Sequence, residues 1–267
     1  MTHPTASKTF LAAALALAAA TCVPALAAGK AAAPTAAAAA MGDTTVVLVH
    51  GAFADGSSWD KVIPLLQAKG LKVVAVQNPL TSLADDVAAA QRAIDAATGK
   101  VVLVGHSWGG TVITQAGAGD KVKALVYVAA LAPSEGQSSA DVGKDYPPTT
   151  GIQKVKADAA GFLSMSPEDI ATEFAQDLPR ATTRVMAVTQ GPIQGKAFAE
   201  PVTVVAWKNK PNYYLVAAKD RMIQPALQQA LAKTLNATTV TLPTGHVPMQ
   251  SQPRAVADLI VKAAQAK

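Results

Sequence analysis

The sequence has little cysteine, few aromatic side chains and few charges. Among 267 residues it has one cysteine, Cys22, while 4% of the residues are aromatic and 15% are charged. So few aromatic rings do not supply the stacking platforms that bind single-stranded nucleic acid, and the basic residues are scattered rather than clustered. No nucleic-acid partner is therefore predicted. Because half of the residues are hydrophobic, the composition excludes a disordered chain and provides for a large core.

The first 27 residues have the pattern of a secretory signal peptide. Lys8 precedes an apolar run from Phe10 to Val23, and Ala25-Leu26-Ala27 offers the small residues that a signal peptidase requires. We therefore predict a signal peptide over residues 1–27 and an exported protein, either periplasmic or secreted. The apolar run is too short for a stable membrane span. An uncleaved anchor and a merely Ala-rich tail are the alternatives.

Export would leave a mature chain without cysteine. Cleavage after Ala27 removes Cys22, so the mature protein has no disulfide, no thiol nucleophile and no Cys-ligated metal. Lipidation of Cys22 is an alternative that the sequence leaves open. Residues 28–43 are Ala-rich and lack a periodic polar face, which predicts a flexible linker before a domain over residues 44–267. A start at Met41 would instead give a cytoplasmic form.

Along this domain, β-branched apolar runs alternate with segments of helical spacing. Thr45 to Val49 and Val101 to Val104 are runs of the kind that is buried on both faces of a sheet. The alternation predicts an α/β fold, with a mostly parallel sheet covered by helices on both faces. The predicted strands are 45–49, 72–76, 101–104, 122–130, 213–218 and 238–242, and the predicted helices are 59–69, 82–97, 109–118, 225–235 and 253–266.

Residues 133–207 interrupt this alternation. They hold short helical pieces among many prolines and glycines, and 167–176 is the clearest of these pieces. An insertion of this size after the fourth strand predicts a helical lid at the carboxyl edge of the sheet, where open α/β sheets bind ligands. We expect Phe53, Phe162 and Phe174 to line a substrate pocket there. A cover that contacts no substrate is the alternative.

Gly105-His106-Ser107-Trp108-Gly109 is the strongest chemical signal in the sequence. This G-x-S-x-G stands directly between a predicted strand and a predicted helix, the context in which the motif forms a sharp turn that exposes the serine hydroxyl. Ser107 is therefore predicted to be a nucleophile. A serine that only caps the helix is the alternative.

A serine nucleophile needs a base, and the base needs an acid that orients it. On folds with this turn, the acid and then the base follow the serine along the chain. Asp220 and His246 each follow a predicted strand, at the same sheet edge as Ser107, and we predict them as acid and base. Glu135, which follows the fourth strand, is the rival acid. His106 is expected to point away, because it precedes the serine on its strand.

An oxyanion formed at this serine would need two backbone N–H donors. One donor comes from the residue after the nucleophile and the other from the first loop of the domain. This rule predicts Trp108 and Ala52, with Phe53 as the nearest competitor for the second donor. His50 in the same loop is expected to hold the loop by hydrogen bonding rather than to take part in the chemistry.

From Val46 to the C-terminus, the sequence resembles the α/β-hydrolases. Within them it is most similar to the small branch of plant methyl esterases and hydroxynitrile lyases, with bacterial esterase-like relatives. The resemblance rests on VVLVHGAFADGSSWDKVIPLL, VVLVGHSWGG, YYLVAAKDRMIQPALQQALA and LPTGHVPMQSQPRAVADLI, and it covers the chain apart from the leader and most of the lid. It implies that Ser107 is the nucleophile, His246 the general base and acid, and Asp220 the residue that orients His246.

The sequence thus predicts a serine hydrolase, a carboxylesterase for small or medium esters that forms an acyl-enzyme. It implies no metal, nucleotide or flavin cofactor, its partner is a small-molecule ester, and the oligomeric state stays open. The alternatives are a lyase or a cofactor-free perhydrolase on the same three residues, or a slow-turnover ligand-binding protein of this fold. Plant hydroxynitrile lyases use a lid lysine, for which Lys196, Lys208 and Lys210 are candidates.

Overall fold

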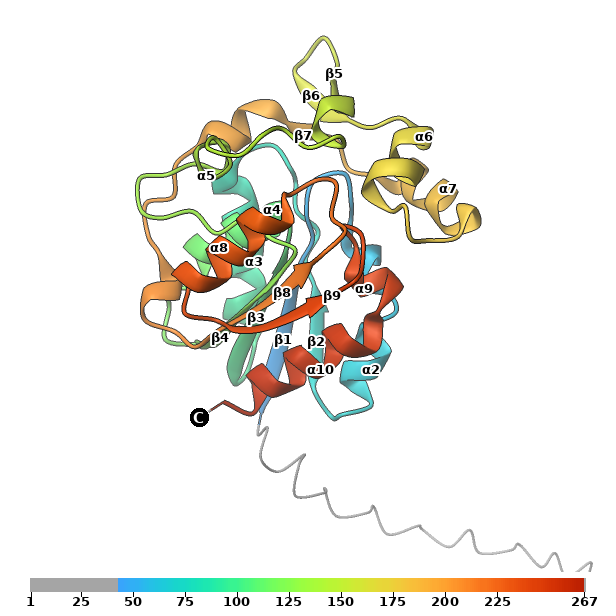
Figure 1. The fold of residues 1–267 in the computed structure, drawn as a ribbon. Coiled ribbons are helices and arrows are strands. Elements are labelled where there is room, and N and C mark those ends of the chain that lie inside the picture. Colours follow the sequence, from blue (N-terminus) through green and yellow to red (C-terminus); the bar gives the residue numbers. More distant parts are fainter. Residues whose placement is uncertain (1–42, 267) are drawn as a thin grey trace, which may run out of the picture. The chain divides into compact units, whose positions relative to one another are not determined.

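A computed structural model describes residues 43–266. The predicted signal peptide, Cys22 and nearly all of the predicted linker lie outside these residues. At the centre is a six-stranded sheet in the order β2-β1-β3-β4-β8-β9, and every neighbouring pair in it is parallel (Figure 1). Its strands are β1 (Thr44–Val49), β2 (Lys72–Ala75), β3 (Lys100–His106), β4 (Val122–Val128), β8 (Asn212–Ala217) and β9 (Thr238–Leu242).

The position of each strand in the sheet follows from its hydrophobic pattern. The four inner strands are buried along almost their whole length, as their runs of valine and leucine require. The two edge strands, β2 and β9, alternate between exposed and half-buried residues. All six predicted strands are confirmed. The fourth ends at Val128 rather than Ala130, since Ala129 turns the chain with a φ of 45°.

Helices flank this sheet (Figure 1). The capping role of Ser82 is clear, because its hydroxyl accepts a hydrogen bond from the Asp85 N–H at the start of α3. The predicted helix 59–69 is wrong as a single element: a 3₁₀ turn and a short α-helix replace it. Pro64 explains the break, because a proline without an N–H suits only the first turn of a helix. These elements are η1 (Gly56–Trp59), α2 (Ile63–Gln67), α3 (Leu83–Ala96), α4 (Trp108–Ala116), α8 (Pro225–Thr234), α9 (Pro248–Ser251) and α10 (Pro253–Ala264).

The inserted segment, residues 133–207, lies over the end of the sheet toward which the strands run (Figure 1). The predicted helix 167–176 is a short α-helix followed by one turn of π-helix, and two features were not predicted: the helix α7 and a small antiparallel sheet β5-β6-β7. The elements are α5 (Ser139–Val142), η2 (Ile152–Lys154), β5 (Lys156–Ala157), β6 (Phe162–Ser164), α6 (Pro167–Asp169), η3 (Ile170–Phe174), α7 (Arg180–Thr189), β7 (Ile193–Gln194), η4 (Gly195–Ala199) and η5 (Ala206–Lys208). No helix within residues 43–266 is long and apolar enough to cross a membrane.

Candidate active site

Ser107 occupies a strained turn between β3 and α4. Its φ of 54° and ψ of −121° lie in a region that residues with a side chain rarely adopt. The turn is held because the Ser107 N–H donates to the Val128 carbonyl, and the Ser107 carbonyl accepts from the Leu131 N–H. A Cβ at Gly109 would come within 2.5 Å of the Val49 carbonyl oxygen, so the helix packs this closely on β1 only with glycine there. The motif therefore presents the serine side chain above the sheet edge.

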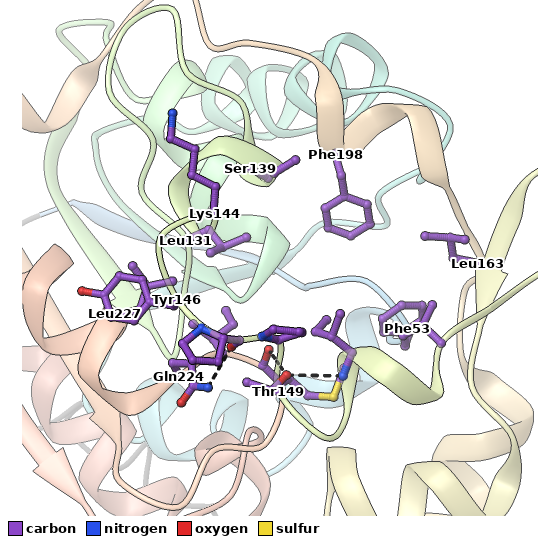
Figure 2. Close-up of a pocket in the computed structure, with 18 residues that line it drawn as sticks. Phe53, Leu131, Ser139, Lys144, Tyr146, Thr149, Leu163, Phe198, Gln224 and Leu227 are labelled. Atoms are coloured by element: carbon purple, nitrogen blue, oxygen red, sulfur yellow. Dashed lines mark hydrogen bonds between the residues drawn. The ribbon is translucent and has the colours of Figure 1, made fainter.

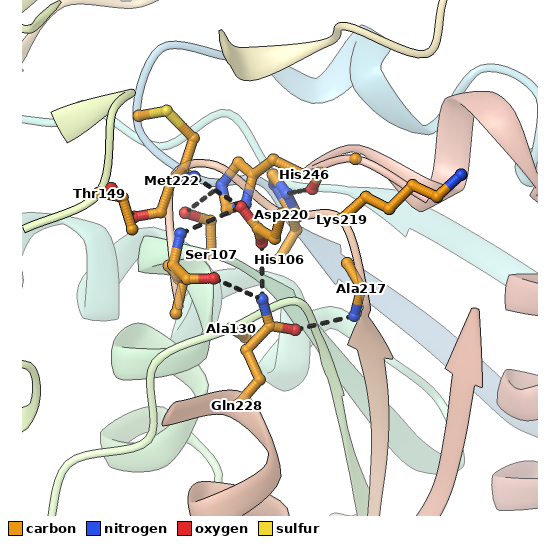
Figure 3. A network of polar contacts seen from close by, with 12 residues as sticks. His106, Ser107, Ala130, Thr149, Ala217, Lys219, Asp220, Met222, Gln228 and His246 are labelled. Carbon is orange, nitrogen blue, oxygen red and sulfur yellow. Dashed lines mark hydrogen bonds and ion pairs between the residues drawn. The ribbon is translucent and has the colours of Figure 1, made fainter. Parts of the chain in front are cut away.

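Three side chains form a continuous polar chain at this edge (Figure 3). His246 Nε2 lies 2.9 Å from Ser107 Oγ, and His246 Nδ1 lies 2.7 Å from Asp220 Oδ2. Since a carboxylate only accepts, Nδ1 carries the proton and donates it to Asp220, which leaves Nε2 to accept from the serine hydroxyl. All three residues are buried, and Ser107 retains 9% exposure.

The Asp220 carboxylate is surrounded by hydrogen-bond donors. Oδ1 accepts from the backbone N–H groups of Met222 and Ile223, at 2.7 and 3.0 Å. Oδ2 accepts from His246 and, at 2.7 Å, from the Gln228 side-chain amide. The rival acid lies elsewhere: Glu135 forms an exposed ion pair with a lysine. The structure therefore brings Asp220, and not Glu135, to the histidine.

The loop after β1 lies directly against the serine turn. A Cβ added at Gly51 would stand 2.7 Å from Ser107 Cβ. His50 holds the loop, since its Nε2 accepts from the Asn78 N–H at 2.9 Å and its Nδ1 lies 2.9 Å from the Gly51 carbonyl oxygen. Burial lowers the pKa of His50, which keeps the ring neutral in this role.

In the described part of the chain, backbone N–H groups without an acceptor stand in the loop after β1 and at the start of α4. In the loop, the N–H groups of Ala52 and Phe53 donate to no acceptor within residues 43–266. Phe53 has a φ of 58°, which turns the chain at this point. Trp108 opens α4 directly after the serine, so its N–H has no partner within the helix. The predicted donors Ala52 and Trp108 thus have unused N–H groups, and so does the competitor Phe53.

A cavity of about 530 Å³ has a mostly apolar lining, which includes none of Ser107, Asp220 and His246 (Figure 2). Two of the lining residues contact the hydrogen-bonded side chains: the Leu131 N–H holds the serine turn, and the Met222 N–H donates to Asp220. Lys144 is the one charged residue in its wall. The other lining residues are Phe53, Leu131, Ser139, Ala140, Gly143, Tyr146, Pro147, Pro148, Thr149, Ile152, Val155, Leu163, Phe198, Met222, Ile223, Gln224 and Leu227. Of the three predicted pocket residues, Phe53 lines this cavity and Phe162 and Phe174 do not.

Residues 46–259 match the alpha/beta hydrolase family. The chain belongs to this family. The match spans the sheet apart from the first two residues of β1, the serine turn and the loops that carry Asp220 and His246. Membership confirms the α/β-hydrolase fold expected from the sequence and, with the hydrolase and esterase relatives described next, shows an enzyme.

Individual relatives of this hydrolase agree with the expected branch. The Pyrethroid hydrolase of Sphingobium wenxiniae is 26% identical over 266 residues, which cover 84% of this chain and 88% of the relative. Putative methylesterase 14, a chloroplastic protein of Arabidopsis thaliana, is 25% identical over 267 residues, which cover 82% of this chain and 71% of the relative. A solved structure of the pyrethroid hydrolase PytH superposes with a TM-score of 0.75 at 24% identity, over 84% of this chain and 98% of that one.

The hydrolase also holds the Trp108 side chain through a buried carboxylate. Asp86 on α3 accepts from the Trp108 indole N–H at 2.7 Å and from the Leu80 backbone N–H at 2.8 Å. Burial raises the pKa of Asp86 to about 6. On its other side, the Trp108 ring meets Phe198 of the inserted segment, with ring centroids 5.1 Å apart.

Two rings pack behind the histidine of the polar chain. The prediction that His106 points away from the site is wrong: its ring centroid lies 4.7 Å from that of His246, and its Nε2 donates to the His246 carbonyl at 2.8 Å. Burial holds the pKa of His106 well below its usual range, so the ring is neutral. Phe174 approaches His246 edge-on at 5.2 Å. Phe174 therefore supports the histidine rather than the cavity wall.

The lysines considered for a lyase lie away from the cavity of this hydrolase. Lys208 pairs with Glu135 at 3.5 Å, and Lys210 donates to the Gly119 carbonyl. Lys196 is exposed on η4 and does not line the cavity. None of the three therefore stands where a lid lysine would meet a substrate in the 530 Å³ space.

Residues 170–177, which we call the strap, connect the inserted segment by hydrogen bonds to the two loops that carry Asp220 and His246. The Gln176 amide donates to the Lys219 carbonyl at 2.7 Å, next to Asp220. The Asp177 carboxylate accepts from the Gly245 N–H at 2.9 Å, next to His246. Sequence reasoning did not predict these contacts, because each joins residues far apart in the chain.

Proposed function

We propose that this hydrolase is a carboxylesterase that cleaves small or medium esters through Ser107, His246 and Asp220. The observation that carries the proposal is the unbroken hydrogen-bonded chain from Asp220 through His246 to Ser107 Oγ, beside an apolar cavity. A nucleophile, a base within hydrogen-bond reach and a third group that orients the base are the parts that acyl transfer requires.

The first half of the reaction forms an acyl-enzyme. His246 Nε2 takes the hydroxyl proton as Ser107 Oγ attacks the ester carbonyl, and Asp220 stabilises the resulting imidazolium. The oxyanion accepts the N–H of Trp108 and that of Ala52, with Phe53 as the alternative donor; each such donor is worth about 3 kcal/mol of barrier. The C–O bond then breaks, and the imidazolium passes its proton to the leaving alcohol.

The second half releases the acid. His246 takes a proton from a water molecule, which attacks the acyl carbonyl, and the proton returns to Ser107 Oγ as the carboxylic acid leaves. The apolar lining supports a substrate with an uncharged hydrophobic group in the cavity. The names of two relatives, a pyrethroid hydrolase and a putative methylesterase, support ester cleavage as the reaction.

We also propose that the enzyme is exported. The leader predicted over residues 1–27 supports export, and an exported enzyme would meet esters outside the cytoplasm. None of Lys196, Lys208 and Lys210 lines the cavity, but Lys144 of the inserted segment does, so a lyase with a lid lysine stays an alternative. A cofactor-free perhydrolase and a slow-turnover binding protein use the same three residues, so kinetics must separate them from an esterase.

A burst assay with p-nitrophenyl esters of increasing acyl length tests this function. The wild-type enzyme should give a burst or steady release of p-nitrophenol, and Ser107→Ala should lower kcat by a factor of roughly 10⁵ to 10⁶. The control is Ser57→Ala, which removes an exposed hydroxyl from the 3₁₀ turn η1 and should leave kcat within about twofold. Circular dichroism spectra should show that both variants are folded.

Other outcomes would contradict the esterase. Near-full activity in folded Ser107→Ala would remove the serine from the mechanism. A single burst without turnover would favour a binding protein. Release that requires hydrogen peroxide would favour a perhydrolase.

A further inference from the structure

The Gln228 side chain connects Asp220 to the helix behind it. Gln228 stands in the first turn of α8 and is fully buried. Its Nε2 donates to Asp220 Oδ2 at 2.7 Å and to the Ile223 carbonyl at 2.9 Å, while its Oε1 accepts from the Ala217 N–H at 2.9 Å (Figure 3). A buried amide with all three contacts satisfied is held in one position.

The direction of the amide follows from its neighbours. The Ala217 N–H can only donate, so it must face the amide oxygen. The NH₂ group therefore faces the two acceptors, Asp220 Oδ2 and the Ile223 carbonyl. If the amide were flipped, oxygen would face oxygen on one side and two donors would meet on the other.

We propose that Gln228 is a positioning residue of the esterase: its amide fixes the Asp220 oxygen that orients His246. The proposal rests on the function proposed above. Oδ2 is the one oxygen that accepts from both His246 and Gln228, each at 2.7 Å. Because the amide donor is anchored at Ala217 and Ile223, it holds Oδ2 at a fixed distance from the imidazole. A hydrogen bond from a neutral donor also favours the carboxylate over the protonated acid.

His106 and Tyr214 are two buried titratable groups close to the polar chain. His106 faces His246 and stays neutral, because burial holds its pKa well below the usual range. Tyr214 lies near Asp220, and burial raises the pKa of its hydroxyl.

Gln228→Leu is the sharpest test, because leucine has a similar size and removes the donor to Asp220 Oδ2 without adding a charge. One donor fewer leaves more negative charge on Oδ2, which favours the imidazolium, so the acid limb of the kcat/KM profile should move to higher pH. At neutral pH kcat should fall by roughly tenfold to a hundredfold, with KM changed less than about threefold. Gln228→Glu is the conservative counterpart: two buried carboxyl groups this close share one proton, so the acid donates to Oδ2 in place of the amide and should keep most of the activity.

Gln229→Leu is the matched control. Gln229 is the next residue on α8, is exposed, and undergoes the same substitution. It should leave kcat within about twofold and the acid limb in place. An equal shift of the limb in Gln229→Leu would assign the effect to a general change in the helix and overturn the positioning role. Unchanged kcat and profile in Gln228→Leu would overturn it as well, as would a loss that is the same at every pH.

A spectroscopic readout separates this proposal from the proposed function. The His246 Nδ1 proton should give a far-downfield ¹H NMR resonance, because it lies in a short hydrogen bond to a carboxylate. The resonance should shift or vanish in Gln228→Leu and stay in Gln229→Leu. If the wild type cleaves no ester but the resonance responds in this way, the function fails and the positioning role stands. If the wild type is an active esterase and the resonance is unmoved, the positioning role fails alone.

Discussion

Two parts of the inserted segment contact the site in different ways. The strap, residues 170–177, contacts it by hydrogen bonds: besides Gln176 and Asp177, the Thr172 carbonyl accepts from the Arg221 guanidinium at 2.7 Å. The other part, which we call the roof, consists of residues 143–163 and Phe198, and it borders the cavity mainly with apolar side chains. The strap meets the loops of the acid and the base, whereas the roof meets the space where we place the substrate.

This difference assigns separate roles to one insertion. Directional hydrogen bonds fix the position of a loop, so changes in the strap should alter turnover. Apolar contacts depend on shape and area, so changes in the roof should alter which ester binds. The π-helical turn η3 fits this division, since π-helical turns often occur at functional sites, and it delivers Phe174 against His246.

Asp177→Ala should have the largest effect of the variants in the inserted segment. It removes the acceptor of the Gly245 N–H, and a loop that shifts by a fraction of an ångström misplaces the neighbouring His246. We expect kcat to fall between about tenfold and a hundredfold, with little change in KM. Steady-state kinetics on one p-nitrophenyl ester give both constants.

Asp177→Asn is the conservative counterpart. Its side-chain oxygen still accepts from the Gly245 N–H, so it should retain most of the activity. A loss in Asp177→Asn as large as in Asp177→Ala would show that charge, and not the fixed loop, matters. A rise in KM without a fall in kcat would show that the strap acts on substrate binding, so the strap and the roof would not have separate roles.

Val155→Phe in the roof should change selectivity rather than turnover. The larger side chain takes up part of the cavity that Val155 lines. We expect the ratio of kcat/KM for the octanoate over the acetate p-nitrophenyl ester to fall roughly tenfold. The acetate ester should react within about twofold of the wild-type rate.

The control for this variant is Val188→Phe, which makes the same change on α7, at a residue that is 82% exposed. It should leave both esters unaffected. Equal losses for acetate and octanoate in Val155→Phe would mean that the roof, like the strap, positions the reacting groups.

The central sheet and the polar chain could be predicted from the sequence for physical reasons. Strands buried on both faces must be continuous apolar runs, and a serine on a sharp strand-to-helix turn needs glycines beside it. The order of Ser107, Asp220 and His246 along the chain then placed all three at one sheet edge, where the structure has them.

The inserted segment was less accessible, because its structure depends on contacts distant in sequence. β5, β6 and β7 have two or three residues each, too few for a periodic pattern. α7 leaves Val185 and Val188 exposed, so it shows no apolar stripe facing a core. Gln228 did leave a signal: it stands between Leu227 and Leu231 on the buried face of α8, where a polar residue must have a partner.

Asp86 lies on α3 and connects the inserted segment to the central domain through Trp108 and Leu80. Its substitution should alter stability more than activity. Through Trp108 it supports the ring against which Phe198 packs, and through Leu80 it reaches β7, since the Leu80 carbonyl accepts from the Gln194 N–H at 2.8 Å. The pKa of Asp86 is raised from 3.8 to about 6, so the folded protein favours its protonated form.

The pH dependence of unfolding tests this buried carboxylate. Because the folded-state pKa is the higher one, the stabilisation is complete below about pH 4 and is lost as the pH rises through 6. Relative to Asp86→Asn, the wild type should lose up to about 3 kcal/mol of unfolding free energy between pH 4 and pH 7, measured in urea. Asp85→Asn is the control. Asp85 is the exposed neighbour of Asp86, and hydrogen bonds from the hydroxyls of Thr81 and Ser82 lower its pKa, so the contribution of Asp85 to stability should not fall as the pH rises. If the difference in unfolding free energy between the wild type and Asp86→Asn does not change with pH, Asp86 is ionised over the whole range. A charged carboxylate would then hold this part of the inserted segment, as Asp177 does in the strap.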